Sequence, residues 1–258
     1  VFNGVQGNEY SFFTRATDNV GNEEALKTAG ETSTSLGGVK LSVKVFLEGP
    51  YNASAGLMAD NLRSNSLVPL TDPYPALGFV HVQNPDDQVT TTSVLSTTGN
   101  NAIVDWVFLE LRDQNDSTQV AATRAALLQR DGDVVDMDGV SEVEFSGTGA
   151  GDYYVAVRHR NHLGAMTAAP VTIGLDSVLV NFTHPATDTY GTLAQKQISG
   201  ARVLWAGNCV TDGILKYSGL NNDRDAILQR IGGSVPTNFV NGYFIEDANM
   251  DGVVKYAG

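Results

Sequence analysis

The sequence has a single cysteine, Cys209, and no run of apolar residues long enough to cross a bilayer. One thiol cannot form a disulfide within the chain, so the stability of the fold must come from packing or from a bound metal. We expect Cys209 itself to be inert. A membrane-spanning helix needs about 20 consecutive apolar residues, so none is predicted. The sequence does not open with a basic and apolar leader, and we expect any export signal to lie upstream in a longer precursor.

Positive charge is also scarce. The chain has 16 Lys and Arg against 29 Asp and Glu, which gives a formal net charge of -13. Nucleic acids and anionic membrane surfaces are bound by clustered Lys and Arg, so both are excluded as partners. An acidic balance suits an extracellular protein and supplies oxygen ligands for hard cations such as Ca²⁺.

Known catalytic motifs are missing as well. The sequence contains no Gly-x-Ser-x-Gly, no His-Glu-x-x-His and no phosphate-binding loop. We therefore expect that the chain is not an enzyme.

What the sequence does contain favours strands and turns: 42% of its residues are hydrophobic, only 17% are charged, and Thr, Ser, Asn, Gly and Val are frequent. A length of 258 residues predicts two or three domains. The fold class is predicted to be mainly β.

The first predicted part is residues 1–35. An alternating segment from Glu9 runs into the turn Asp18-Asn-Val-Gly-Asn22, and a linker rich in small residues follows over Glu23 to Gly38. The strand and turn resemble the last strands of fibronectin type III or immunoglobulin-like modules. The resemblance implies that this part is the truncated end of such a module.

Residues 36–185 are predicted to form a β-sandwich. Three segments alternate apolar and polar residues, which predicts one core face and one polar face for each: Val39–Leu47, Ala102–Leu111 and Tyr153–His159. Gly-Asp-Tyr-Tyr-Val-Ala-Val resembles a strand of transthyretin-like sandwiches, so the sandwich is expected to be immunoglobulin-like or transthyretin-like. Residues 51–60 lack alternation and are predicted to be a loop or short helix, with Leu57, Met58 and Leu62 packing inward.

Residues 198–258 contain an internal repeat. The window Asn208–Gly219 matches Asp247–Gly258, with identical Asp, Gly, Lys, Tyr and final Gly. Calcium loops place oxygen ligands at alternate positions before a sharp Gly turn and a ligating carbonyl. The second copy supplies this pattern with Asp247, Asn249, Asp251 and the Val253 carbonyl.

The first copy is weaker, because Val210 cannot ligate through its side chain. Its candidate ligands are Asn208, Asp212 and the Ile214 carbonyl, with Asp223 or Asp225 as a late carboxylate. A short helix is predicted over Asp225–Ile231, ending at Gly232. Both loops are also compatible with plain Asx turns.

The repeat, together with Trp205-Ala-Gly-Asn, Asn-Asp-Arg-Asp and Gly-Gly-Ser-Val-Pro-Thr-Asn238, resembles the dockerin-like tails of large adhesin- or hemagglutinin-like proteins exported by type IX secretion. The resemblance implies a secreted or cell-surface adhesive segment with a Ca²⁺-stabilised loop-helix duplication, truncated in its second copy. Its expected partner is another protein or a neighbouring module. The alternatives are a carbohydrate-binding module attached to an absent catalytic domain, and a subunit of an extracellular fibre.

Several further residues allow a functional and a structural interpretation. His159 and His162 are a possible metal pair, but solvated or hydrogen-bonded histidines are the favoured interpretation. Trp106 and Tyr153 would form a sugar platform if exposed, but their strands predict core positions. Asp131 to Gly139 is predicted to be a hairpin turn rather than a cation site. Asp116-Ser-Thr118 and Asp176-Ser-Val178 resemble the sites at which such secreted proteins are O-glycosylated, which implies Ser117 and Ser177 as candidates.

Overall fold

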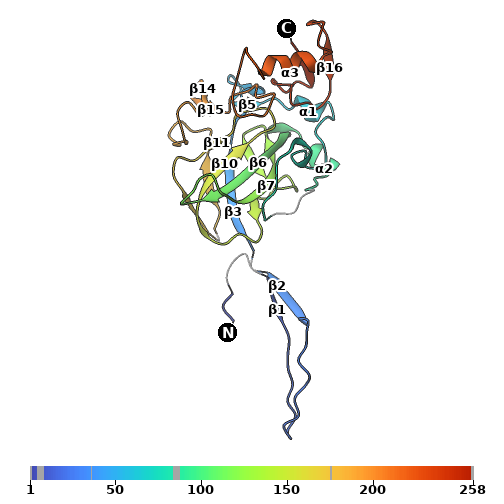
Figure 1. The fold of residues 1–258 in the computed structure, drawn as a ribbon, viewed down its shortest axis with the longest axis vertical. Coiled ribbons are helices and arrows are strands. Elements are labelled where there is room, and N and C mark those ends of the chain that lie inside the picture. The colour runs from blue at the N-terminus through green and yellow to red at the C-terminus, as the bar shows by residue number, and fades with distance from the viewer. Residues whose placement is uncertain (1, 5–8, 36, 84–87, 175, 257–258) are drawn as a thin grey trace.

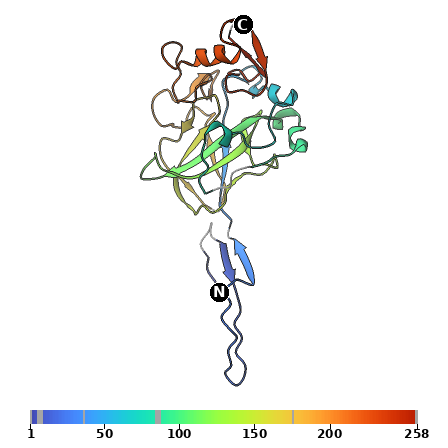
Figure 2. The same cartoon turned by 45° about the vertical axis from the view of Figure 1, so that its right-hand side comes forward.

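The computed structural model describes residues 2–4, 9–35, 37–83, 88–174 and 176–256. The protein is mainly β, with 33% strand and 9% helix, which confirms the predicted class. Along its longest axis it consists of a projecting two-stranded arm, a body built around one large sheet, and a loop-rich end that carries the only long helix of the described residues (Figures 1 and 2). The C-terminal end lies at the pole of the body opposite the arm (Figure 1).

The arm is an antiparallel hairpin of β1 (Glu9–Phe12) and β2 (Thr32–Ser35). Its tip is the predicted turn, in which the Asp18 carboxylate accepts hydrogen bonds from the backbone N–H groups of Val20 and Asn22. β2 lies within the segment that was predicted to be a linker. That prediction is wrong for these four residues, because their backbone pairs with β1 in an antiparallel ladder.

The body contains a nine-stranded sheet in the order β11-β10-β6-β7-β8-β3-β13, in which β12 also pairs with β10 and β9 with β3. All pairs are antiparallel except β13 with β3. The strands are β3 (Val39–Lys44), β6 (Ile103–Asp113), β7 (Val120–Gln129), β8 (Asp133–Val135), β9 (Val143–Phe145), β10 (Gly151–Arg158), β11 (Ala165–Met166), β12 (Val171–Ile173) and β13 (Val178–Asn181).

The central strand β6 is buried on both faces from Ile103 to Leu111. The prediction of one polar face is therefore wrong for this strand, although its position is right. Its sequence, Ile-Val-Asp-Trp-Val-Phe-Leu-Glu-Leu, is a nearly continuous apolar run interrupted by two carboxylates, which is typical of a strand covered on both sides. Both carboxylates, Asp105 and Glu110, are buried.

One face of β6 is covered by the chain between β3 and β6. The indole of Trp106 donates to the Pro69 carbonyl at 2.9 Å, and the Tyr74 hydroxyl donates to the Trp106 carbonyl at 2.9 Å. The rings of Tyr74 and Phe79 pack on Phe108. This covering segment contains β4 (Tyr51–Asn52), β5 (Leu57–Met58), α1 (Asn61–Ser64), η1 (Pro75–Leu77), α2 (Thr92–Leu95) and η2 (Gly99–Asn101).

The inward packing predicted for residues 57–62 is confirmed for Met58 and Leu62, which are fully buried, whereas Leu57 is half-buried. The predicted loop or short helix is a two-residue hairpin, β4 with β5, followed by α1.

The loop-rich end begins after β14 (Lys196–Ile198) and β15 (Ala201–Val203), which form a small hairpin. It contains α3 (Asp223–Arg230) and the hairpin of β16 (Phe239–Asn241) with β17 (Val253–Lys255). The predicted helix is confirmed, and it starts two residues earlier because Asn222 caps it by accepting from the Asp225 N–H at 3.0 Å. Gly232 and Gly233, both at positive φ, end it. No helix within the described ranges has the length and apolar character needed to span a membrane.

Candidate metal centre

The sequence repeat recurs in the backbone of two loops at the C-terminal end. Thr211 and Met250, at matching positions, have φ of 53° and 59°, and Gly213 and Gly252 have φ of 76° and 86°. A left-handed residue followed two positions later by a left-handed glycine turns the chain sharply, and only glycine adopts this conformation without strain. Gly258, the last residue of the second copy, lies outside the described residues.

The second loop encloses the buried carboxylate of Asp247. Its two oxygens accept hydrogen bonds from the N–H groups of Asp251, at 3.3 Å, and Gly252, at 2.8 Å. Burial raises the pKa of the Asp247 carboxyl above its ordinary value, and the bond from Gly252 offsets only part of this effect. A buried carboxylate of this kind is stabilised by a cation.

Asn249 and Asp251 lie beside each other in the same loop, and the Asn249 amide donates to the Asp251 carboxylate at 3.0 Å. Burial works against the charge of Asp251, but hydrogen bonds from Lys255 and Asn249 hold the pKa of its carboxyl below its ordinary value. The other Asp251 oxygen accepts from the Val253 N–H at 2.8 Å, which orients the start of β17.

The first loop contains an unpaired buried acceptor. Asn208, which occupies the position of Asp247, is 7% exposed, and its side-chain oxygen has no hydrogen-bond partner. Asp212 accepts from the Ile214 N–H at 2.9 Å, which repeats the bond between Asp251 and Val253. The side chain of Ile214 is exposed, so only its backbone takes part in the loop.

Of the two late carboxylates predicted for the first loop, the structure brings Asp223 to it. The buried Asp223 carboxylate accepts from the N–H groups of Cys209 at 2.7 Å, Val210 at 3.2 Å and Lys216 at 2.8 Å, and so joins both ends of the loop. Asp225 instead accepts from the Asn222 amide within the helix cap.

The donor groups of both loops fit a hard cation in their chemistry, because carboxylate, amide and carbonyl oxygens are the ligands of Ca²⁺. Within the described part of the chain, no three His, Cys, Asp or Glu side chains converge into a metal-binding group. A cation in either loop would therefore need amide and backbone oxygens as well as the loop acids as ligands.

A contact between the two copies was not predicted from the sequence. The Arg224 guanidinium lies 4.2 Å from the ring centroid of Tyr217 and 4.8 Å from that of Tyr256, the matching tyrosines of the repeat. Arg224 also donates to the Tyr256 hydroxyl. One helix residue thus joins both copies into a single unit by cation–π contacts.

The second loop is anchored in the body. The Asn161 amide donates to the Asp247 carbonyl at 2.7 Å, and Met250 is buried among core residues. Gly49 approaches the loop so closely that an added Cβ would lie 2.3 Å from the Ala248 carbonyl oxygen. Any larger residue at position 49 would displace this loop.

A buried ionic network lies beneath the second loop. The Asp105 carboxylate of β6 accepts from Arg160 at 2.9 Å, from His159 at 3.2 Å and from the Tyr243 hydroxyl at 2.7 Å. Arg160 also donates to the Phe244 carbonyl, and its guanidinium lies 4.3 Å from the Tyr243 ring centroid. The network therefore joins the sheet to the segment that leads into the second loop.

The charged form of Asp105 is stabilised by its neighbours in this network. Burial alone would raise the pKa of Asp105, but the charge of Arg160 and the hydrogen bond from His159 hold it far below its ordinary value. The remaining Arg160 nitrogen, Nη2, has no partner. The one signal of this cluster in the sequence is an aspartate inside the apolar run of β6.

The two histidines belong to the same network, and the favoured hydrogen-bonded interpretation is confirmed for both. His159 donates through Nε2 to Asp105, so its Nδ1 is the acceptor for the Asn161 N–H at 3.4 Å. His162 accepts through Nε2 from the Gly49 N–H at 3.2 Å, so Nδ1 carries the proton and donates to the Asn161 side-chain oxygen at 2.8 Å. Both rings are neutral in this arrangement.

Acid should destabilise the protein through these histidines. Burial lowers the pKa of His159, and burial together with the nearby His159 and Arg160 lowers that of His162 well below its ordinary value of 6.5. The folded state then binds fewer protons than the unfolded state below that pH, so stability is full above it and falls as the pH is lowered, by up to about 1.4 kcal/mol per pH unit for each histidine.

Urea unfolding between pH 8 and pH 5, followed by circular dichroism, measures this effect. The exposed His184 supplies a matched control, and His184→Gln should leave the pH profile unchanged. A free energy of unfolding that is the same at pH 7 and pH 5 would contradict the assignment of neutral buried histidines.

The remaining candidates are placed as follows. Trp106 is fully buried and Tyr153 half-buried, so the prediction of core positions is confirmed for Trp106. Cys209 is buried, and burial, with the nearby charge of Asp223, raises the pKa of its thiol to about 12, which keeps it unreactive. Ser117 lies half-buried in the turn between β6 and β7, and the Ser177 hydroxyl donates to that of Ser42.

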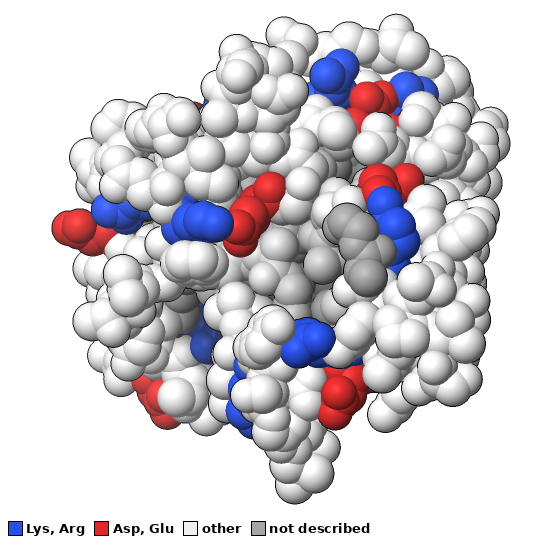
Figure 3. Space-filling model, turned by 90° about the horizontal axis from the view of Figure 1, so that it is seen from above, with Lys and Arg blue, Asp and Glu red and all other residues white. Residues whose placement is uncertain are grey.

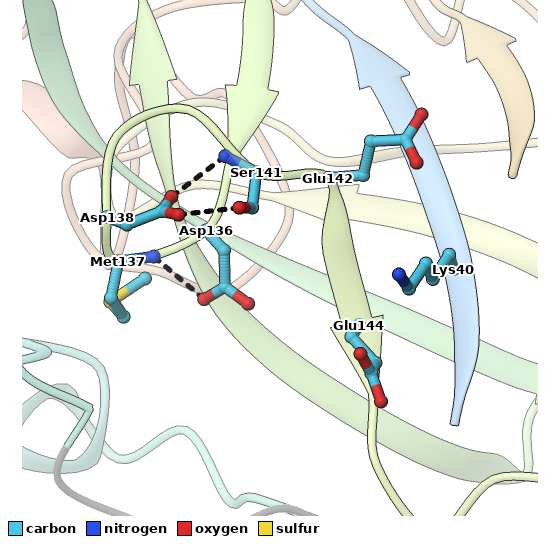
Figure 4. A pocket seen from close by; sticks show the side chains of 7 residues that line it. All are labelled: Lys40, Asp136, Met137, Asp138, Ser141, Glu142 and Glu144. Carbon is cyan, nitrogen blue, oxygen red and sulfur yellow. Dashed lines mark hydrogen bonds between the residues drawn. The ribbon is translucent and has the colours of Figure 1, made fainter. Parts of the chain in front are cut away.

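The segment Asp131 to Gly139 is a pair of turns that flank β8. Asp131-Gly132 joins β7 to the antiparallel β8, so the hairpin prediction is confirmed there, whereas β8 and β9 both pair with β3 rather than with each other. Next to the second turn is a hollow of about 540 Å³ lined mainly by Lys40 and four acids (Figure 4). Asp136 and Asp138 accept from Met137 and Ser141 of their own turn, so both are used as turn residues.

Charge on the C-terminal face is sparse and mixed. Lys and Arg lie next to Asp and Glu in small groups separated by uncharged surface (Figure 3). This face therefore carries no broad patch of one sign that would favour a strongly charged partner.

Comparison with known proteins gives no assignment. No protein-family model matches the sequence, and no curated protein and no solved structure is significantly similar to it.

Proposed function

We propose that the chain is a structural and adhesive module of a larger secreted or cell-surface protein, with no catalytic role, in which the two C-terminal loops bind Ca²⁺ in a dockerin-like unit. One observation carries the proposal: the sequence repeat is also a repeat of backbone conformation, with left-handed residues at matching positions of both loops. Repeated sharp turns with oxygen donors at alternate positions are the arrangement that calcium loops use.

The proposed immunoglobulin-like or transthyretin-like sandwich fits this role, since a large antiparallel sheet is a rigid support for an end that docks. The sparse charge and the acidic balance suit an extracellular protein. Bound Ca²⁺ would provide a partner for the unpaired oxygen of Asn208 in the first loop and would neutralise Asp247 and Asp251 in the second. The unit would then dock on a neighbouring module or on a protein partner.

Calcium should raise the stability of the protein, and the gain should depend on the loop acids. At a free concentration 100 times the dissociation constant, one site adds about 2.7 kcal/mol. We expect heat release in calorimetry and a higher Tm in 5 mM Ca²⁺. This concentration is chosen because extracellular modules bind Ca²⁺ with dissociation constants that reach the millimolar range. Asp251→Ala should remove the effect at the second loop, and Asp212→Ala at the first.

Asp176→Ala is the matched control, because this exposed aspartate lies outside both loops. Equal Tm values with and without Ca²⁺, together with no binding heat, would reduce the repeat to a packing motif. An effect that survives both loop substitutions would place the cation elsewhere.

A further inference from the structure

A second cavity lies outside the loops and the buried network. It has a volume of about 540 Å³ and is formed by the 188–197 segment, by Arg202 of β15 and by Trp205. Small-molecule sites fall in the range of about 300–1,000 Å³ and combine an apolar surface with a few polar groups. This cavity has that composition, with Trp205 as its aromatic residue and Arg202, Gln195 and Asp188 among its polar ones.

Trp205 is held in a fixed position at the cavity. Its indole N–H donates to the Leu193 carbonyl at 2.9 Å, and the Lys196 ammonium lies 5.4 Å from its ring centroid. Leu193 is a non-glycine residue at φ 55° whose side chain is 85% exposed. Strained backbone of this kind persists only when surrounding contacts hold it, and it is concentrated at ligand sites.

Two polar side chains of the cavity have hydrogen-bonding groups without a partner among the described residues, an acceptor on Gln195 and donors on Arg202. The Gln195 amide nitrogen donates to the Phe182 carbonyl at 2.9 Å, but its buried oxygen has no donor. Arg202 donates one N–H to the Thr187 carbonyl at 2.6 Å, and no carboxylate of the described residues forms an ion pair with it. Lys196, in contrast, is neutralised by Glu48 at 2.5 Å.

A ligand for this site therefore needs a group that accepts from Arg202 and an apolar face for the indole of Trp205. Hydroxyl groups both donate and accept, and the C–H face of a pyranose ring packs on an aromatic side chain. We propose that the cavity at Trp205 binds a sugar unit of a glycan. This inference rests on the adhesive role proposed above and names the class of its ligand.

Binding can be followed by tryptophan fluorescence of the full chain. The second tryptophan, Trp106, is fully buried, so a ligand-dependent change in emission reports Trp205. The probes are hexasaccharides of β-1,3-glucan, β-1,4-glucan, chitin, β-1,4-mannan and polygalacturonate, each titrated to 10 mM. We expect saturable binding of at least one probe with a dissociation constant below 1 mM.

Trp205→Ala and Arg202→Gln should each weaken binding of that probe at least tenfold. Calorimetry measures the binding of Trp205→Ala, which lacks the fluorescent indole. If the Trp205→Ala variant melts at a lower temperature, Arg202→Gln, which leaves the indole in place, decides. Tyr217→Ala is the matched control, because this tyrosine is 75% exposed on the first loop and outside the cavity, and it should bind as the unchanged protein does.

The outcomes separate this proposal from the calcium proposal. Binding should persist in EDTA and in the Asp251→Ala variant, since the cavity contains neither loop. No saturable binding of any probe at 10 mM, or binding that is unchanged in both cavity variants, overturns the glycan site even if Ca²⁺ stabilises the protein.

Discussion

Replacing Asp105 by asparagine should lower the free energy of unfolding by about 3–5 kcal/mol, since removing one partner of a buried ion pair leaves the other charge uncompensated. Arg160 would remain fully buried. Its Nη2 already has no partner, and its Nε would lose the hydrogen bond to the Asp105 carboxylate. The Tyr243 hydroxyl would lose its charged acceptor at the same time. Urea unfolding at pH 7, monitored by circular dichroism, measures the loss.

The double variant Asp105→Asn with Arg160→Met tests whether the cost comes from the isolated charge. Because the methionine removes that charge, the double variant should have a higher free energy of unfolding than Asp105→Asn alone. Such non-additive effects of two substitutions are expected for residues in contact. Asp133→Asn serves as a matched control, because Asp133 pairs with Lys44 at the surface, where such pairs contribute about 0–1 kcal/mol. A loss below 1 kcal/mol for Asp105→Asn would show that the network is not desolvated.

Trp106→Ala should destabilise the protein by about 3–5 kcal/mol, the range for truncating a large buried aromatic residue. The side chain is completely buried on β6, and its N–H bond to Pro69 ties the covering segment to the sheet. Truncation would leave both a cavity and an unpaired carbonyl. Thermal and urea unfolding measure the change.

Trp106→Phe should cost less than Trp106→Ala, because the ring still fills most of the cavity while only the bond to Pro69 is lost. Trp205→Ala supplies the comparison at a half-buried tryptophan and should cost less than Trp106→Ala. The expected order fails if truncation at position 106 costs no more than truncation at position 205.

Features with a local signal were predictable. The segments predicted as strands located β3, β6 and β10 within three residues of their bounds, and Gly232 marked the end of α3, whereas its start was predicted two residues too late. The loop pair was visible because its residues repeat at a fixed spacing. In each of these elements, side-chain pattern and backbone geometry are coupled within a few residues.

Features made by distant contacts were not predictable. The burial of both faces of β6 depends on the covering segment, whose irregular sequence has no period. The link between Asp105 and Tyr243 joins residues 138 positions apart, and no local pattern specifies such a pair. Arg224 likewise contacts two tyrosines that lie on opposite sides of it in the chain.

The candidate site was predicted in part. The residues of the second loop were assigned from spacing, whereas the choice between Asp223 and Asp225 depended on the direction in which each side chain leaves the first turn of α3. The cavity at Trp205 gave no sequence signal, because its lining residues come from a segment without periodicity, from Arg202 of β15 and from Trp205.

The attachment of the arm determines how the protein would respond to tension. The arm leads into β3, which lies in line with it and is flanked by β13 on one edge and by β8 and β9 on the other (Figure 1). Gly38, at the junction, donates to the Glu144 carboxylate at 2.9 Å and has no room for a side chain against Phe145. A pull on the arm would therefore act along β3 and load the hydrogen bonds of both edges in shear, so that they must break together rather than one after another.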